Sequence, residues 1–257
     1  MSCPAKSFAG AIAATLLLGA CSGELSTLDP AGPAASRIAT LWWVMLGGAF
    51  VILLGVMGTA IYALRSAAKE RNFSTRKVLI GWGLAFPIAT LLALMAVSFL
   101  PGELLPRSPE ENAIRAQAHQ WFWTFDYPGG ERTIDVLHVP AGEEFAIAIT
   151  SEDVIHSFWI PRLGGKIDAV PGKVNHIRLK ADRPGRYLAT CAEYCGIGHA
   201  HMRFEALAHR PEDYAAALTA ATDRAAARAP VLEQRDAPAA LVIEEWGDYL
   251  LDWLGIT

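Results

Sequence analysis

The sequence predicts a membrane-anchored protein with two spanning helices, one all-β domain and a helical C-terminal extension. Three observations predict this class. Two long segments carry no charged residue, a region of short alternating segments follows them, and an Ala-rich segment follows that region. The chain has 257 residues, of which 53% are hydrophobic, a larger share than is usual in a soluble domain. Its net charge of -4 indicates little about partners.

The first residues resemble the signal peptide of a bacterial lipoprotein. Lys6 precedes an apolar run that ends in Leu-Gly-Ala-Cys at positions 18–21. We therefore expect residues 1–20 to be removed and Cys21 to be lipidated, with an ordinary signal peptide as the alternative. Residues 21–37 contain several Pro and Gly residues and are predicted to form a flexible linker.

Residues 38–64 and 78–100 are the two uncharged segments, and each is long enough to cross a bilayer. The loop between them carries five basic residues against Glu70 alone. Positive loops stay in the cytoplasm, so residues 38–100 are predicted to form a transmembrane hairpin. The region after Leu100 then lies on the periplasmic face of the bacterial inner membrane. Buried helices of a soluble protein are the alternative, which the length of both segments disfavours.

Residues 101–215 are predicted to form the β-domain. Residues 121–125 are dense in aromatic residues, and residues 145–150 alternate between large and small side chains, as a half-buried strand does. Further strands are expected at 174–179 and 186–190, with a Pro-Gly turn between them. Several short strands at this spacing predict a β-sandwich or barrel of roughly 100 residues.

Residues 216–257 are predicted to be a helical extension. The Ala-rich segment Asp213 to Arg228 has helical composition, and we expect Ala229-Pro230 to break it. Residues 237–256 combine Leu, Ile, Trp and Tyr with several acids. This last segment is predicted to be amphipathic and to lie on a partner, on the membrane or on its own domain.

A cluster of metal-binding residue types lies in the segment 191–202. It contains Cys191, Cys195, His199 and Met202. Thiolate, imidazole and thioether groups together favour copper over zinc. A disulfide between the two cysteines is the alternative in an oxidising compartment, but it leaves His199 and Met202 without a role. His156, far away in sequence, is the candidate for a further ligand.

Three motifs around these residues resemble subunit II of the cytochrome c oxidases of the haem-copper family. They are HSFWIP at 156–161, LGGKIDAVPG at 163–172 and CAEYCGIGHAHM at 191–202. The resemblance implies a cupredoxin-like domain that holds the dinuclear copper centre called CuA. It implies six ligands: thiolates of Cys191 and Cys195, imidazoles of His156 and His199, the thioether of Met202 and the backbone carbonyl of Glu193.

The same resemblance implies further roles near the copper ions. The Glu193 carboxylate is expected to help hold Mg²⁺ at the boundary with subunit I, since carboxylate oxygen suits this ion. Lys166 and Asp168 match positions near that boundary. Trp121 matches the residue through which electrons enter from cytochrome c, although such an aromatic residue is more often strand core.

Three acids near Trp121 are candidates for docking a basic cytochrome c: Asp126, Glu152 and Asp153. His201 matches no ligand position, so we expect it to be exposed to solvent. The remaining histidines match no ligand position either and receive no role: His119, His138, His176 and His209.

The second span departs from the family pattern. Many members carry a glutamate near its start that opens a proton pathway into subunit I. Residues 78–87 of this chain contain no acid. Proton delivery is then expected to begin elsewhere, at another subunit or at Glu70, or the pathway itself differs from that of the family.

The resemblance implies the electron-accepting subunit of a cytochrome c oxidase. Such a subunit takes electrons from cytochrome c and passes them to the haem of subunit I, where oxygen is reduced to water and protons are moved. Subunits I and III are the expected partners, and nucleic acid is not. Three alternatives are a membrane-tethered copper carrier, a quinol oxidase subunit, which would lack the copper ligands, and nitrous oxide reductase, against which the two spans argue.

Overall fold

The computed structural model describes residues 22–65, 74–99 and 112–233. The chain divides into two units, one made of residues 37–108 and the other of all remaining residues. The predicted signal peptide, Cys21, Glu70 and the segment 237–256 lie outside the described residues.

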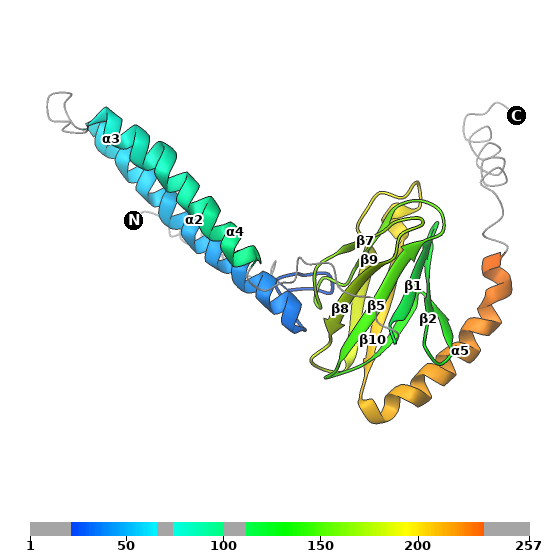
Figure 1. The fold of residues 1–257 in the computed structure, drawn as a ribbon. Coiled ribbons are helices and arrows are strands. Elements are labelled where there is room, and N and C mark those ends of the chain that lie inside the picture. Colours follow the sequence, from blue (N-terminus) through cyan, green and yellow to red (C-terminus); the bar gives the residue numbers. More distant parts are fainter. Residues whose placement is uncertain (1–21, 66–73, 100–111, 234–257) are drawn as a thin grey trace, which may run out of the picture. The chain divides into compact units, whose positions relative to one another are not determined.

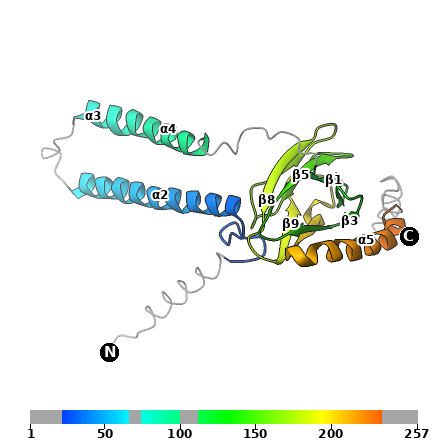
Figure 2. The same cartoon turned by 60° about the horizontal axis from the view of Figure 1, so that its bottom comes forward.

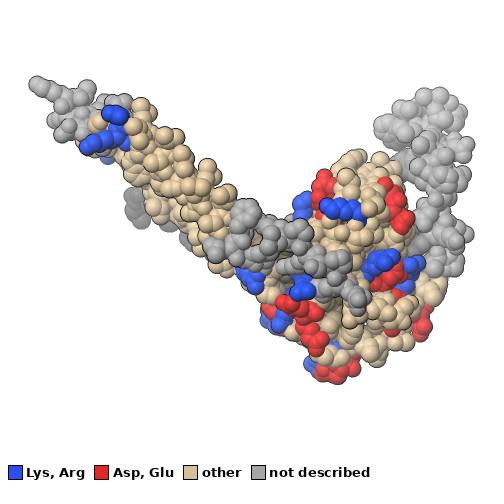
Figure 3. All heavy atoms as spheres, in the orientation of Figure 1, with Lys and Arg blue, Asp and Glu red and all other residues tan. Residues whose placement is uncertain are grey.

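The two uncharged segments form long helices, as predicted. Helix α2 (Pro33–Arg65) begins with a proline at its first position, where the missing N–H breaks no helical bond. The second span consists of α3 (Thr75–Ile80), a π-helical turn η3 (Gly81–Ala85) and α4 (Phe86–Phe99). Both are long and apolar enough to cross a membrane. Basic side chains lie at the end of the helices next to the loop between them (Figure 3).

The β-domain is a sandwich of two five-stranded sheets (Figure 1). The first has the order β3-β2-β1-β5-β8 and the second has the order β4-β10-β9-β6-β7. Pairs β1–β5 and β4–β10 are parallel, and the other pairs are antiparallel. The strands are β1 (Ile114–His119), β2 (Phe122–Asp126), β3 (Arg132–Ile134), β4 (Val136–Pro140), β5 (Glu144–Ser151), β6 (His156–Trp159), β7 (Ile167–Ala169), β8 (Asn175–Lys180), β9 (Gly185–Cys191) and β10 (Arg203–His209).

An aromatic cluster fills the space between the sheets. Trp123 of β2 lies 5.6 Å from Phe158 of β6 and 5.5 Å from Phe204 of β10, measured between ring centroids. All three side chains are almost completely buried. Burial of one such side chain stabilises the fold by roughly 2–3 kcal/mol, so this cluster holds the two sheets face to face.

Residues 22–36 form a strap that packs on the β-domain, so the prediction of a flexible linker is wrong for this segment. The Ala31 N–H donates to the Arg162 carbonyl at 2.7 Å. A Cβ atom at Gly32 would lie 2.2 Å from the Lys180 carbonyl oxygen, so only glycine fits there. The strap therefore lies directly on the backbone that follows β6 and on the end of β8.

Helix α5 (Pro211–Glu233) covers one side of the sandwich and contacts β3, β4 and β10 (Figure 2). It buries Leu218, Ala221 and Ala225, which are spaced to share one helix face. The predicted break at Ala229-Pro230 is wrong, because the helix continues to Glu233. Pro230 lies in the last turn, where its missing N–H costs only one helical hydrogen bond.

Candidate metal centre

Three neighbouring strands of the second sheet bring the predicted ligands together. His156 begins β6, and Cys191 ends β9. The chain then forms a loop, ends it with the short helix η4 (His199–His201) and enters β10 directly after Met202. The Cys191 N–H donates to the Met202 carbonyl at 3.0 Å and closes this metal loop, residues 191–202.

The sulfur atoms of the loop converge. Cys191 Sγ lies 3.8 Å from Cys195 Sγ, and Cys195 Sγ lies 3.7 Å from Met202 Sδ. All three side chains are buried. Both cysteines are free, and their separation is well beyond a disulfide bond length of about 2.05 Å.

Two imidazoles complete the convergence. His156 Nδ1 lies 3.2 Å from Met202 Sδ and 3.8 Å from Cys191 Sγ. His199 Nδ1 lies 3.7 Å from Cys195 Sγ. Metal-binding atoms of His156, Cys191 and Cys195 all lie within 4.8 Å of one another. The five side chains predicted as copper ligands therefore meet at one place.

The two ends of Glu193 lie in different surroundings. Its backbone carbonyl accepts a hydrogen bond from the Cys191 thiol at 3.2 Å. Its carboxylate lies 3.5 Å from Lys166 Nζ, which in turn lies 3.7 Å from Asp168. The carbonyl is thus available to the metal centre, while the carboxylate shares an exposed ionic cluster with both residues that the sequence placed near it.

Trp121 packs against the metal loop and lies just before β2. Its indole N–H donates to the Cys195 carbonyl at 3.1 Å, and the Gln120 side-chain amide donates to the same oxygen at 2.7 Å. A Cβ at Gly198 would lie only 2.3 Å from the Trp121 ring, so the indole rests on glycine backbone. The core tryptophan of this strand is Trp123, which is fully buried, whereas Trp121 is half-buried beside the predicted ligands.

Asp153 has a role that the sequence did not reveal. One carboxylate oxygen lies 2.8 Å from His156 Nε2, and the other accepts the Gln120 N–H at 2.7 Å. A proton on Nε2 leaves Nδ1 free to face the sulfur atoms, so the carboxylate sets the ring's tautomer and orientation. Asp153 was predicted only as a docking acid. Its spacing of three residues before a ligand histidine is the one signal that sequence offered.

The pKa values at the centre follow from these contacts. Burial lowers the pKa of His156, but hydrogen bonds with Cys191 and Asp153 outweigh it and raise the pKa overall. Burial raises the pKa of Cys191, but its contacts, first of all with His156, bring it down to about 6. Burial and the neighbouring Cys191 charge raise the pKa of Cys195 to about 12. Without a metal ion, the thiol pair therefore readily loses only one proton.

The other charged and imidazole candidates lie apart from the donor atoms. Asp126 forms an ion pair with Arg132, which balances its charge, whereas Glu152 is exposed. His201 is exposed, as expected. His138 and His209 pair with each other, with Nδ1 and Nε2 2.9 Å apart.

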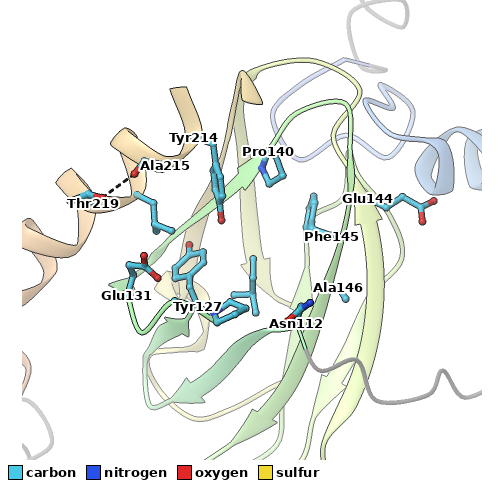
Figure 4. Close-up of a pocket in the computed structure, with 14 residues that line it drawn as sticks. Asn112, Tyr127, Glu131, Pro140, Glu144, Phe145, Ala146, Tyr214, Ala215 and Thr219 are labelled. Atoms are coloured by element: carbon cyan, nitrogen blue, oxygen red, sulfur yellow. Dashed lines mark hydrogen bonds between the residues drawn. The ribbon is translucent and has the colours of Figure 1, made fainter. Parts of the chain in front are cut away.

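A cavity of about 520 Å³ lies at the other end of the sandwich, where α5 begins (Figure 4). Tyr127, Phe145, Tyr214 and Leu218 contribute to its walls, and no predicted metal ligand does. Strand β10 begins directly after Met202 and ends with His209 paired to Pro140, which lines the cavity, so the cavity and the metal centre are separated by the length of that strand.

The donor set fits copper. Two thiols, a thioether and two imidazoles are soft or intermediate ligands, and copper takes all of them. Four of the five side chains are buried, with only His199 partly exposed, so the site suits an ion that is held permanently.

Comparison with known proteins agrees with the motifs. A family model described as "Cytochrome C oxidase subunit II, periplasmic domain" matches residues 132–207. Cytochrome c oxidase subunit 2 of Alkalihalophilus pseudofirmus is 34% identical over 221 residues, which cover 78% of this chain and 64% of that protein. Quinol oxidase subunit 2 of Bacillus cereus is 31% identical over 217 residues, which cover 77% of this chain and 74% of that protein.

Among solved structures, the periplasmic domain of subunit II of cytochrome oxidase (CoxB) of Bradyrhizobium japonicum is similar, with 27% identity and a TM-score of 0.42. The match covers 46% of this chain and 98% of that domain. The chain spans less than two thirds of the Alkalihalophilus pseudofirmus relative but about three quarters of the quinol oxidase subunit. Over that length, sequence identity and motifs agree: this chain belongs to the subunit II family of the haem-copper terminal oxidases.

Proposed function

We propose that this chain is the electron-accepting subunit of a cytochrome c oxidase and that it holds two copper ions as a CuA centre. The observation that carries the proposal is the convergence of Cys191, Cys195, His156, His199 and Met202, with two free thiols 3.8 Å apart. Cys191 and Cys195 would hold the copper ions through their thiolates, and the Glu193 carbonyl beside Cys191 would supply one more oxygen.

When bound, the copper pair supplies a one-electron carrier that needs little rearrangement on oxidation. The chain's own residues prepare the place for it. Positive metal charge lets the second thiol lose its proton, which the free pair resists. Asp153 holds His156 with Nδ1 toward the sulfur atoms. The buried setting keeps water away from the thiolates.

Trp121 is the proposed point at which electrons enter. Its indole is half-buried, and its N–H binds the carbonyl of a ligand residue, Cys195. A donor that docks over this ring is therefore connected to the metal loop by one hydrogen bond. Exposed Glu152, whose N–H donates to the Ala118 carbonyl at 3.1 Å, offers a negative charge to a basic donor such as cytochrome c, while Asp126 is already paired with Arg132.

The remaining partners are proposals on the same basis. Electrons leave toward the haem of subunit I, where oxygen is reduced and protons are moved, and subunit III completes the complex. The Glu193 carboxylate, free of the copper site, contributes to a Mg²⁺ site at the boundary with subunit I, in the place where Lys166 now lies 3.5 Å away.

A quinol oxidase subunit is the second candidate, because several relatives at 31% identity carry that name. The complete set of soft donors argues against this candidate. In a quinol oxidase the electrons would enter at another place in the complex, and this subunit would need no metal ligands. A membrane-tethered copper carrier would require a labile ion, which the burial of four ligand side chains disfavours.

The test uses the full chain, purified with its oxidase subunits in mild detergent. We expect two copper ions per chain in excess of the other subunits' copper, a delocalised mixed-valence EPR signal and oxidation of reduced cytochrome c. His199→Ala should lose the signal, whereas the matched variant His201→Ala, in an exposed position two residues away, should keep it. Turnover with reduced quinol and no EPR signal in the wild type would reject the proposal in favour of the second candidate.

A further inference from the structure

The cavity beside α5 has walls that suit large apolar side chains. Tyr127, Phe145, Tyr214 and Leu218 give it aromatic and aliphatic surface (Figure 4). The Tyr127 hydroxyl accepts the His138 N–H at 2.7 Å, so this polar atom already has a partner. The volume of about 520 Å³ leaves room for more than water, and apolar walls favour an apolar occupant.

The side of α5 that lines the cavity continues along the helix as small side chains. Ala215 and Thr219 line the cavity, and Thr222 and Ala226 follow on the same side, because all four recur every three or four residues. The hydroxyl of Thr219 donates to the Ala215 carbonyl at 3.0 Å, and that of Thr222 donates to the Leu218 carbonyl at 3.1 Å. This side of α5 therefore presents uncharged, small groups on which a second helix can pack closely.

The chain's own C-terminal sequence has the complementary pattern. On a helix, three large apolar residues of the segment 238–256 share one side: Trp246, Leu250 and Trp253. Four acids share the opposite side: Glu244, Glu245, Asp248 and Asp252. The segment contains no Lys or Arg, whereas helices that lie on a membrane surface are usually rich in them. The pattern therefore favours a protein surface over the membrane as the place where this segment docks.

The length of the segment matches the surface. From Tyr214 to Glu233, α5 extends about 28 Å, and a helix over residues 238–256 would extend about 27 Å. Residues 234–237 form a connection of the length that joins two antiparallel helices. A segment that turns back after Glu233 therefore brings Trp253 to the level of Leu218, where the cavity lies.

We propose that residues 238–256 fold back along α5 as a second helix, with Trp253 in the cavity and Trp246 on the small side chains of α5. Glu131 and Glu144 also line the cavity, so like-charge repulsion turns the acidic side of the segment toward solvent. The segment completes the β-domain at the end opposite the metal centre. This inference goes beyond the proposed function, because it does not depend on copper or on the electron donor.

The test measures how fast chymotrypsin cleaves the full chain after Trp246. The chain is purified in mild detergent, alone and together with the other oxidase subunits, and fragments are quantified by mass spectrometry. Ala215→Arg places a long charged side chain at the cavity and should speed this cleavage at least about tenfold, the effect of losing the burial of one large apolar side chain. Ala216→Arg, at the neighbouring exposed position that does not line the cavity, should cleave like the wild type.

A second pair of variants tests the segment itself. Trp253→Glu puts a charge on the apolar side and should also speed cleavage after Trp246 at least about tenfold. Asp248→Asn, on the acidic side, should leave the rate unchanged.

The other possible occupants give different results, and each would overturn the proposal. Wild-type cleavage as fast as in Ala215→Arg would mean that the segment is not docked. Protection only in the presence of the other subunits would assign it to a partner, and protection only in lipid nanodiscs would assign it to the membrane. Protection that is lost on dilution of the isolated chain would assign it to a second copy. The copper-to-protein ratio of each sample tests the proposed function independently.

Discussion

Two buried histidines at opposite ends of the β-domain have pKa values shifted in opposite directions. His156, at the metal end, is fully buried, yet its contacts with Cys191 and Asp153 raise its pKa against the effect of burial. His138, toward the α5 end, is 2% exposed, and burial, His209 and Arg224 together lower its pKa to about 4. Burial is nearly equal, so the charge of the partner decides the direction.

The two histidines also differ in whether a ring nitrogen is left open to a ligand. Asp153 contacts Nε2 of His156, and Nδ1 faces Met202 Sδ at 3.2 Å and Cys191 Sγ at 3.8 Å, where a metal ion is expected. His138 instead directs Nδ1 at His209 Nε2, 2.9 Å away, so the two rings satisfy each other. The carboxylate behind the His156 ring, and not burial, is thus what leaves one nitrogen of this imidazole open to a ligand.

The largest expected effect comes from removing each histidine in turn. His156→Leu should abolish the two-copper EPR signal and lower the copper content per chain, since one of the proposed copper ligands is lost. His138→Leu should keep both coppers and lower the free energy of unfolding by about 1–3 kcal/mol, because His209 loses its partner. Metal analysis and urea unfolding of both variants provide the measurement. Equal copper loss in the two variants would break the comparison.

The next effect is on stability in acid. The His138 pKa is near 4 in the folded chain and about 6.5 in the unfolded chain, so the unfolded chain binds more protons between these values. Stability supplied by neutral His138 is therefore present above pH 6.5 and is lost as the pH falls, by about 2–3 kcal/mol between pH 7 and 4.5. Urea unfolding at both pH values measures it. His138→Leu is the control, and an equally steep loss in that variant would contradict the assignment.

A smaller effect should follow from removing the carboxylate behind the ligand. Asp153→Ala leaves the His156 ring without its acceptor, and copper affinity should fall about 10- to 100-fold, as is usual for such supporting residues. Competition with a Cu(I) chelator gives the affinity. Glu152→Ala removes the neighbouring exposed acid and should leave copper affinity unchanged. If both variants bind copper like the wild type, Asp153 does not position the ring.

The smallest effect is expected where Trp121 rests on the metal loop. Gly198→Ala puts a methyl group into the space of the indole and should lower the free energy of unfolding by about 1–2 kcal/mol, while it weakens the bond to the Cys195 carbonyl. Tryptophan fluorescence and urea unfolding measure both changes. Ile197→Ala, next to it and 74% exposed, should change stability by less than about 0.5 kcal/mol.

Much of the fold and of the candidate metal centre was predictable from the sequence, because motifs and hydrophobic periodicity indicate them directly. The uncharged segments became helices, and all four predicted strands exist with boundaries shifted by about one residue. The five side chains predicted as copper ligands also lie together. Six strands were not predicted. Strands β3, β6 and β7 have only three or four residues, which is too little alternation to detect. The longer strands β1, β4 and β10 were missed as well.

What remained hidden depends on contacts between distant residues. The strap looked flexible because Pro and Gly usually mark loops, yet Gly32 is required by close contact with Lys180. Asp153 looked like a surface acid because its partners, Gln120 and His156, meet only in the folded domain. The role of each residue is fixed by a neighbour that local sequence cannot identify.

The strap has a consequence for biosynthesis. Residues 22–36 leave the ribosome before both spans, but the backbone they bind, at Arg162 and Lys180, is made after them. The smallest complete β-domain is therefore discontinuous in the gene, with the membrane hairpin inserted between its two pieces. Its N-terminal piece is translated before both apolar helices and its remaining strands after them, so the domain that holds the metal loop closes only when both helices have been made.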